Sequence, residues 1–277
     1  MIFEFALPSN PKIKVRMHEA TVADAMDFSG VDPNFEEEAI SLFLERVQEK
    51  ETYTDPREWT GEDRRFAVFM YHCNTTRDKT ISLSFKCPVC GEKHTSDVLL
   101  SDILGTYTPI EGDDFREFPY NGHNVIVKPM NGGDLETAEK LRYDLLLSRE
   151  DLESKKDTMT AEQRQVQENI IRDKTVKLTM FNVLCRVDLP FLDEKLDKKG
   201  RRPLVEDFIK QMPAVDFKEF FENVSSAIAE MRHGLKMSYS DGQLFVEIPK
   251  VHCDNNPEAG EVLLRYPFRC SEYIPTI

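Results

Sequence analysis

Two cysteines in a short turn are the side chains of this chain best suited to chemistry. Cys87 and Cys90 occur in the pattern CPxCG, in which the proline fixes one φ angle and the glycine permits a positive one. Two thiolates at this spacing supply half of a tetrahedral zinc site. His94 lies a few residues further on, so three ligands can converge around one turn without help from distant segments. The pattern predicts a zinc knuckle.

A fourth protein ligand has to come from elsewhere, because the chain contains no second CxxC pair. Cys253 or His252 would serve if a second hairpin tip meets the first, and a water molecule is the remaining candidate. Cys73 is a poor candidate, because the strand expected between it and Cys87 would carry the two roughly 20 Å apart.

The same turn is compatible with two other interpretations. One is a knuckle that has lost its metal and is held together by hydrophobic packing. The other is redox chemistry of the CxxC pair, but such pairs in thioredoxin-like proteins open a helix in a βαβ unit, whereas this one joins two antiparallel strands. We therefore expect either bound Zn²⁺ or an empty knuckle.

Alternating apolar residues on both sides of the turn predict the hairpin that positions these ligands. The alternating residues are Leu83 and Phe85 before the turn, and Val98 and Leu100 after it. A second hairpin is expected near the carboxyl end, where apolar residues alternate over 244–248 and again over 262–268. Cys253 would lie near the tip of this second hairpin.

Several further elements follow from periodicity and capping residues. A capping box formed by Thr60 and Asp63 is expected to open a helix, although the run from Phe66 to Tyr71 also fits a buried strand. Asn121-Gly122 is typical of a hairpin turn, and we expect residues 80–130 to form one small antiparallel β-module. The other expected elements are a hairpin over residues 3–15 with its turn at 8–11, a helix capped by Thr21, a helix after residue 35, and helices over 204–212 and 216–233.

A long helical hairpin is expected in the middle of the chain. Asp134 would cap its first helix, the charged stretch 148–162 would form its tip, and the second helix would begin at Ala161 and end before Pro190. Both helices have an apolar face. These faces would pack against each other or the rest of the chain, or dock on a partner.

Together these elements predict an α+β fold. Small antiparallel β-modules, one with the CPxCG hairpin, accompany the long helical hairpin and a carboxyl-terminal helix with a β-hairpin. We expect four consecutive segments: residues 1–58 with a β-hairpin and helices, 59–130 with the knuckle-containing β-module, 131–190 with the α-hairpin, and 191–277 with the carboxyl-terminal helices and β-hairpin.

The charge of the chain restricts its partners. It has 277 residues and a formal net charge of −14, which opposes sequence-independent binding to nucleic acid. The basic stretch 198–202 is expected to be an exposed loop, and contact with nucleic acid there is the less favoured alternative. No apolar run approaches the roughly 20 residues that span a bilayer, and the amino terminus lacks the features of a signal peptide. We expect no membrane span and a reducing cytoplasm.

Motifs of the common enzyme classes do not occur in this sequence. It has no GxxxxGK[ST] phosphate loop, no GxGxxG fingerprint, no GxSxG elbow and no HExxH helix. Its histidines are scattered, and Cys185 lies in an apolar run that indicates a core position. We expect a protein without catalytic activity.

Five stretches of the chain follow one another in an order known from a protein family. They are residues 5–9, WTGEDRRF at 59–66, FKCPVCG at 85–91, MPAVDF at 212–217, and the terminal β-hairpin. The chain thereby resembles the baseplate hub and tail-assembly proteins of T4-like contractile-tailed bacteriophages. The resemblance implies Cys87 and Cys90 as knuckle ligands. The carboxyl-terminal hairpin departs from the pattern, because Cys253 stands there without a CxxC partner.

The resemblance also implies a function. The chain would be a late structural protein that acts near the central hub through contacts with other tail and baseplate proteins, in several copies, first in the host cytoplasm and then in the virion tail. Two alternatives stay open. One is a zinc-ribbon accessory factor that binds nucleic acid, and the other is a tail-assembly chaperone that is absent from the mature virion.

Overall fold

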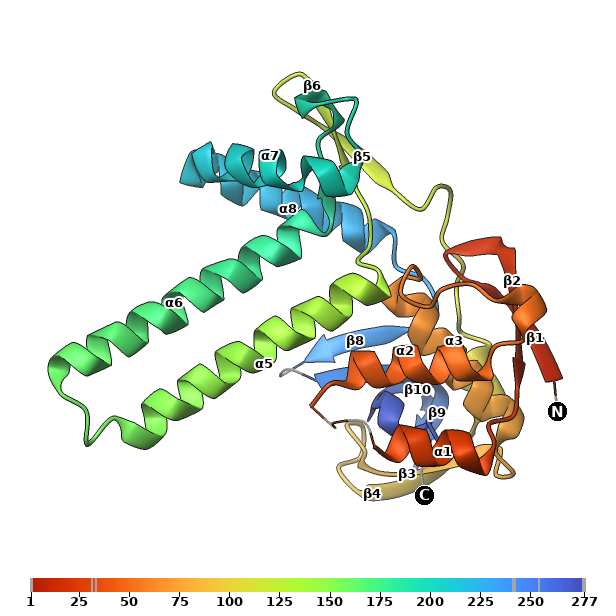
Figure 1. Cartoon of the computed structure of the whole chain (residues 1–277). Coiled ribbons are helices and arrows are strands. Elements are labelled where there is room, and N and C mark those ends of the chain that lie inside the picture. The colour runs from red at the N-terminus through yellow and green to blue at the C-terminus, as the bar shows by residue number, and fades with distance from the viewer. Residues whose placement is uncertain (1, 31, 33, 241–242, 254, 276–277) are drawn as a thin grey trace. The chain divides into compact units, whose positions relative to one another are not determined.

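The computed structural model describes residues 2–275 apart from 31, 33, 241, 242 and 254 (Figure 1). The chain has an α+β fold with small antiparallel sheets and a long helical hairpin, so the predicted fold class is confirmed. It divides into two compact units. Unit 1 comprises Met1–Val31, Glu38–Ile110 and His233–Ile277, and unit 2 comprises Asp32–Glu37 and Glu111–Arg232. The four consecutive segments expected from the sequence stay a prediction.

Unit 1 contains three antiparallel sheets among the residues that the structure describes. They are formed by β1 (Ile2–Leu7) with β2 (Asn10–His18), by β3 (Thr80–Lys86) with β4 (Lys93–Leu99), and, in the order β10-β9-β8, by β8 (Met237–Ser240), β9 (Gln243–Cys253) and β10 (Asn256–Pro267). The helices are α1 (Val22–Ser29), α2 (Glu36–Val47), η1 (Lys50–Thr52), α3 (Gly61–Thr75), α4 (Leu100–Leu104) and η3 (Cys270–Glu272). The predicted hairpins of this unit are confirmed, but β8 was not expected and Leu100 opens α4 instead of continuing β4.

The first turn of α3 is fixed by hydrogen bonds. The Thr60 side chain accepts from the Asp63 amide and the Asp63 carboxylate accepts from the Thr60 amide, so the predicted capping box is confirmed and the strand alternative is wrong. Asp63 is fully buried and also accepts from the amide and the hydroxyl of Ser9 in the β1–β2 turn. His233 Nε2 lies 2.7 Å from Thr60 Oγ1. A buried acid thereby joins three segments of unit 1.

The main core of unit 1 is rich in aromatic rings. Phe69 of α3 meets Tyr273 edge to face, with ring centroids 5.7 Å apart, and Phe268 stacks on Tyr273 at 5.0 Å. Each such pair contributes about 0.5–1.5 kcal/mol beyond the area it buries. The knuckle hairpin adds Leu83 and Val98 to the same core. The base of that hairpin is therefore anchored by apolar packing.

Unit 2 consists of helices and, among its described residues, one three-stranded sheet. Its strands are β5 (Arg116–Tyr120), β6 (His123–Val127) and β7 (Val187–Asp188), and its helices are α5 (Gly132–Lys155), α6 (Ala161–Leu184), η2 (Pro190–Leu192), α7 (Lys198–Gln211) and α8 (Ala214–Glu230). The Asn121-Gly122 turn is confirmed, with both residues at positive φ. However, β5 and β6 lie in a different sheet from β3 and β4. Residues 80–130 do not form one β-module, because α4 and the segment after it separate the two hairpins.

The long helical hairpin of α5 and α6 is confirmed, with differences at its ends. Asn131, not Asp134, caps α5, and α5 continues through part of the charged stretch to Lys155. Exposed ion pairs one helical turn apart support this polar part of the helix; in one of them Lys155 Nζ lies 2.5 Å from Asp151 Oδ1. The Thr160 side chain caps α6. The tip is therefore only the short segment between the two helices.

The basic stretch 198–202 is not an exposed loop. It forms the first turns of α7, which begins well before the predicted residue 204. Arg201 is buried, and its guanidinium donates to both carboxylate oxygens of Asp188, from Nε at 2.7 Å and from Nη2 at 2.6 Å. Arg202 Nη2 donates to Asp134 at 2.7 Å. Both arginines thus pair with acids that are distant in sequence, because a buried carboxylate needs a paired cation.

None of the helices in the described part of the chain has a stretch long and apolar enough to cross a membrane.

Candidate metal centre

The hairpin of β3 and β4 positions three of the predicted ligands. Phe85 pairs with His94 and Lys86 with Lys93, so the turn between the strands contains both cysteines of the CPxCG pattern. The Cys87 amide donates to the Glu92 carbonyl at 2.8 Å, and the Gly91 amide donates to the Cys87 carbonyl at 2.9 Å. These bonds curl the turn so that its cysteines face the first residues of β4.

Gly91 permits this curl. Its φ is +78°, in the region that L side chains rarely adopt. No atom lies within 4 Å of the place where a Cβ would stand, so the requirement for glycine comes from the backbone angle and not from lack of space.

The fourth candidate ligand lies in the second hairpin. Cys253 is the last residue of β9, and its side chain is fully buried, whereas that of His252 is exposed. Neighbouring residues of a strand point to opposite faces of its sheet, so only one of these two candidates can turn towards the knuckle. β4 and β9 are in contact. The structure selects Cys253.

The ligand atoms of Cys87, Cys90, His94 and Cys253 all lie within 4.8 Å of one another. His94 Nε2 is 3.0 Å from Cys90 Sγ and 3.9 Å from Cys253 Sγ. Sulfur ligands of a tetrahedral zinc ion, each about 2.3 Å from the metal, stand about 3.8 Å apart. The four atoms are therefore close enough together to surround one such ion, and this cluster could hold a metal ion.

Most of the cluster is buried, and one of its residues is partly exposed to solvent. Cys87, Cys253 and His94 are buried, and Cys90 is partly exposed. Hydrogen bonds with His94, the larger cause, and with the amide of Glu92 together lower the pKa of Cys90 to about 6. Burial instead raises the pKa of Cys253. At neutral pH at least one sulfur is therefore a thiolate, the form that binds metals.

Asn255 is a site residue that sequence reasoning missed. Its side-chain amide donates to Cys90 Sγ at 3.7 Å. Hydrogen bonds to ligand atoms orient the ligands of metal sites, so Asn255 links the second hairpin to the first a second time. The only sequence signal was a polar residue two positions after Cys253.

A small apolar cluster also joins the two hairpin tips. It contains the buried residues Cys87, Cys253 and Val262, with Phe85 and Leu264 packed against them. Phe85 and Leu264 pack against the main core of unit 1 as well, so the two clusters adjoin. Among the described residues, the tips of the two hairpins thus meet through the potential ligands and this small cluster.

The three other cysteines lie in or against the hydrophobic cores, and Cys270 is buried in the main core of unit 1. Cys73 of α3 is packed against the main core, outside the ligand cluster, and burial raises its pKa to about 12. Among the described residues, the cluster that could hold a metal ion does not include it. Cys185 of unit 2 is buried among apolar side chains, as expected, and burial raises its pKa to about 12. Neither thiol is a ready metal ligand.

Comparison with known proteins adds no further constraint. No protein-family model matches this sequence, and no curated protein or solved structure is significantly similar to it. The residues of the chain and the geometry of the cluster are therefore the basis for a function.

Proposed function

We propose that Cys87, Cys90, His94 and Cys253 bind one structural zinc ion. The observation that supports this is the convergence of their four ligand atoms, from two hairpins, within 4.8 Å of one another. Four protein ligands close a tetrahedral site and leave no open position for a substrate. Three sulfurs and one nitrogen suit zinc, although iron also accepts tetrahedral sulfur ligands. The ion would join the tip of the β9–β10 hairpin to the knuckle.

Cobalt substitution tests this site. Co²⁺ bound by tetrahedral thiolates absorbs strongly in the visible range, and the charge-transfer intensity reports the number of sulfur ligands. We expect the wild-type chain to give this spectrum, Cys87→Ser to lose most of it, and Cys73→Ser to keep it. A wild-type spectrum of hexaaquo cobalt, or one unchanged by Cys87→Ser, would contradict the proposal.

We further infer that the chain is a structural or assembly component of a contractile phage tail baseplate, near its central hub. Two observations support this inference. One is the order of the five stretches that resemble tail-assembly proteins. The other is the helical hairpin of α5 and α6, whose outer surfaces expose apolar side chains between charged ones, as a protein that works through contacts with other proteins requires. In this function the zinc ion stabilises the fold and takes part in no reaction.

Affinity capture during tail assembly tests this function. A tagged chain expressed in infected cells should carry baseplate proteins with it, and mass spectrometry of mature virions should detect the chain if it is a component. Its presence in assembling tails together with its absence from virions would identify a chaperone. Purification of the chain alone, with salt-dependent binding to DNA or RNA, would contradict both functions and favour the nucleic-acid alternative.

A further inference from the structure

Cys90 is the cysteine of this chain that a solute reaches most easily. Four of the six cysteines are buried: Cys87, Cys185, Cys253 and Cys270. Cys73 is partly exposed, but it packs against the main core of unit 1, and burial raises the pKa of its thiol to about 12, so it stays protonated. Cys90 is also partly exposed, and its neighbours in the turn, residues 89, 91 and 92, are all exposed. A small molecule therefore contacts Cys90 without opening the core.

The proposed zinc ion would keep Cys90 in the form that reacts with oxidants. A sulfur that binds zinc is a thiolate, and the thiolate is the nucleophile in reactions with peroxides. Cys90 Sγ also accepts from the side-chain amide of Asn255 at 3.7 Å, and Asn255 is exposed. The sulfur of Cys90 thus lies at the edge of the cluster, where solvent begins.

A second sulfur lies within reach of Cys90. The sulfurs of Cys87 and Cys90 are within 4.8 Å of each other, and a disulfide bond is about 2.05 Å long, so rotation of the two side chains has a short gap to close. The turn itself holds the pair together, because the Gly91 amide donates to the Cys87 carbonyl at 2.9 Å. Cys253 is as near, but it belongs to the second hairpin and depends on the contact between the two tips. Cys87 is therefore the sulfur that stays beside Cys90 once the ion leaves.

We propose that Cys90 is an oxidation site at which a hydroperoxide expels the ion of the proposed zinc site, on which this inference rests. First the Cys90 thiolate attacks one oxygen of hydrogen peroxide. The O–O bond breaks, a sulfenic acid forms, and the leaving hydroxide takes a proton to become water. Then the Cys87 thiolate attacks the sulfur of Cys90. An S–S bond forms, the S–O bond breaks, and a second water leaves. The two sulfurs lose two electrons and the peroxide gains two.

The disulfide would leave too few ligands for the ion. His94 and Cys253 remain, whereas a closed structural site has four protein ligands. Without the ion, the tip of the β9–β10 hairpin keeps only the small apolar cluster around Val262. A dithiol reverses the reaction, because it gives two electrons to the disulfide and becomes a disulfide itself. Oxidants and reductants would thus control how firmly the two hairpin tips are joined.

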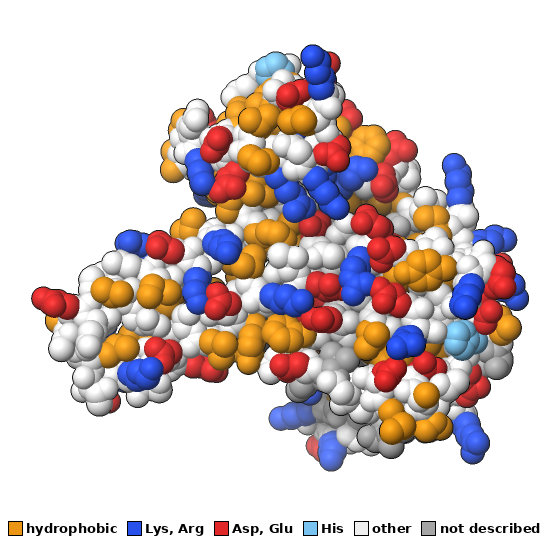
Figure 2. Space-filling view, viewed as in Figure 1, with side chains coloured by type: hydrophobic (Ala, Val, Ile, Leu, Met, Phe, Trp, Pro, Cys, Tyr) orange, Lys and Arg blue, Asp and Glu red, His pale blue; other side chains and the backbone are white. Residues whose placement is uncertain are grey.

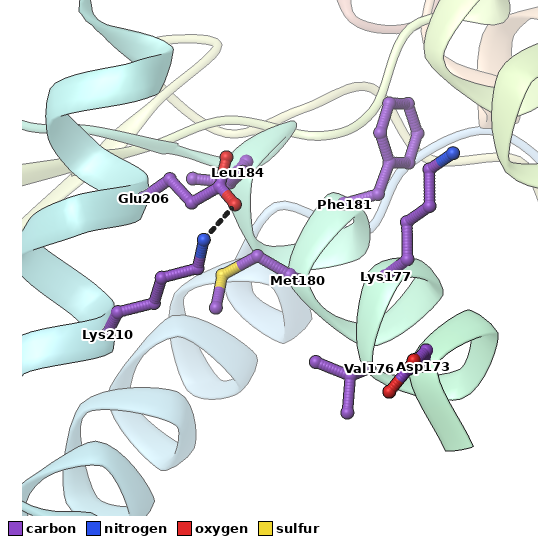
Figure 3. A pocket seen from close by; sticks show the side chains of 8 residues that line it. All are labelled: Asp173, Val176, Lys177, Met180, Phe181, Leu184, Glu206 and Lys210. Atoms are coloured by element: carbon purple, nitrogen blue, oxygen red, sulfur yellow. Dashed lines mark ion pairs between the residues drawn. The ribbon is translucent and has the colours of Figure 1, made fainter. Parts of the chain in front are cut away.

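Met180 of unit 2 is a reference sulfur for the same oxidant. It lines a groove of about 450 Å³ between α6 and α7, opposite Glu206 and Lys210, which form an ion pair at 2.6 Å (Figure 3). Hydrophobic side chains lie between acidic and basic ones along this helical hairpin (Figure 2), and both charged side chains of the groove reach solvent. A thioether is not a thiolate and should react more slowly with peroxide. Oxidation of Met180 therefore marks the dose at which the reaction is no longer selective.

Hydrogen peroxide added to the zinc-loaded chain in thiol-free buffer tests the proposal. A chromophoric chelator follows the zinc released beyond that of a sample without peroxide, and mass spectrometry locates disulfide bonds and oxidised sulfurs. We expect one zinc per chain to be released together with a disulfide between Cys87 and Cys90, about tenfold or more faster than Met180 is oxidised. Cys73→Ser, which keeps all four ligands, should release zinc at the wild-type rate. A dithiol followed by fresh zinc should restore the bound ion.

The possible results separate the oxidation site from the zinc site. A chain that holds no zinc before peroxide is added would refute both. A zinc-loaded chain that keeps its ion until Met180 is oxidised would refute the oxidation site alone. So would a disulfide between Cys90 and Cys253, slower release from Cys73→Ser, or a loss of zinc that a dithiol does not reverse.

Discussion

The cysteine cluster of unit 1 and the ion pair of unit 2 both gather acidic groups in buried places, but they neutralise them differently. In unit 2 the Asp188 carboxylate meets the guanidinium of Arg201, so the chain supplies its own cation. In unit 1 the buried Cys87 and Cys253 are joined by another cysteine and a histidine. In the proposed zinc site the three sulfurs would bind as thiolates, and a cation from solution would neutralise them. In that case one region is complete once the chain has folded, and the other is completed by an ion.

Removal of the metal ion by a chelator should have the largest effect, and it should affect the cysteine cluster but not the ion pair of unit 2. Removing the ion would leave the hairpin tips with only their small apolar cluster, and structural zinc supplies about 10–16 kcal/mol in zinc-finger peptides. We expect amide hydrogen exchange in the turn 87–92 and at the end of β9 to accelerate about 1000-fold or more with a chelator, while β6 and β7 keep their protection. Exchange measured by mass spectrometry checks this. Unchanged exchange at the turn would show that apolar packing alone holds the tips.

Breaking the ion pair should have the next largest effect, and it should be insensitive to chelators. Arg201→Met leaves Asp188 buried without its cation, which costs about 3–5 kcal/mol. Urea unfolding of unit 2, followed by its helical signal, measures the loss. The double variant Arg201→Met with Asp188→Leu should recover most of it, because no buried charge is left. A loss below about 1 kcal/mol in the single variant would mean that the pair contributes no more to stability than an exposed surface ion pair does.

Two threonines that cap helices test whether burial of the cap, and not the capping motif alone, determines how much unfolding free energy a substitution removes. Thr60 opens α3 and lies within hydrogen-bond distance of the buried His233, whereas Thr160 opens α6 in an exposed place. Substitution by alanine removes a capping bond in both cases. We expect Thr60→Ala to cost about 2 kcal/mol and Thr160→Ala about 0.5–1 kcal/mol. Equal losses in urea unfolding would contradict this reasoning.

Glu139 is a half-buried acid that a proton can neutralise, which is a third way besides an ion pair and a metal ion. Its carboxylate accepts from the amides of Glu36 and Glu37, both at 3.0 Å. Burial, with a smaller contribution from the nearby Glu37 carboxylate, raises the pKa of Glu139 from 4.5 to about 7. The folded chain then holds this proton more tightly than the unfolded chain does. Its stabilising effect is full below about pH 4.5 and is lost as the pH rises through about 7.

The matching variant is Glu139→Gln, which cannot ionise. Because Glu139 is partly exposed, solvent reduces the effect to about 1 kcal/mol. Urea unfolding measures the free energy of unfolding at about pH 5 and at about pH 8. The difference between the two values should be larger by that amount in the wild-type chain than in Glu139→Gln. The same pH dependence in both chains would exclude Glu139 as its source.

Local patterns were enough to predict most elements of this fold. The Thr60 capping box and the alternation around the CPxCG turn involve residues close together in sequence, and their geometry follows from the backbone. The same reasoning failed for residues 198–202. Their partners, Asp188 and Asp134, are brought near only by the packing of unit 2. The sequence therefore predicted a solvated loop where the structure has the start of a helix.

The candidate site shows the same limit. Three ligands lie around one turn and could be named from the sequence, but Cys253 follows His94 by 159 residues. Sequence reasoning could narrow the fourth ligand to Cys253, His252 or water. The choice depends on which face of β9 turns towards the knuckle, and that is set by the pairing of β9 with its neighbours and not by any local motif.

The metal content of the purified chain shows whether Cys87, Cys90, His94 and Cys253 bind zinc. Elemental analysis of protein prepared without chelators should find one zinc per wild-type chain and one in Cys73→Ser, whose thiol lies outside the cluster. Cys253→Ser should lose the ion or exchange it rapidly with a competing chelator, because one of four ligands is gone. A wild-type chain without metal, or a Cys253→Ser chain that holds zinc as tightly as the wild type, would contradict the account.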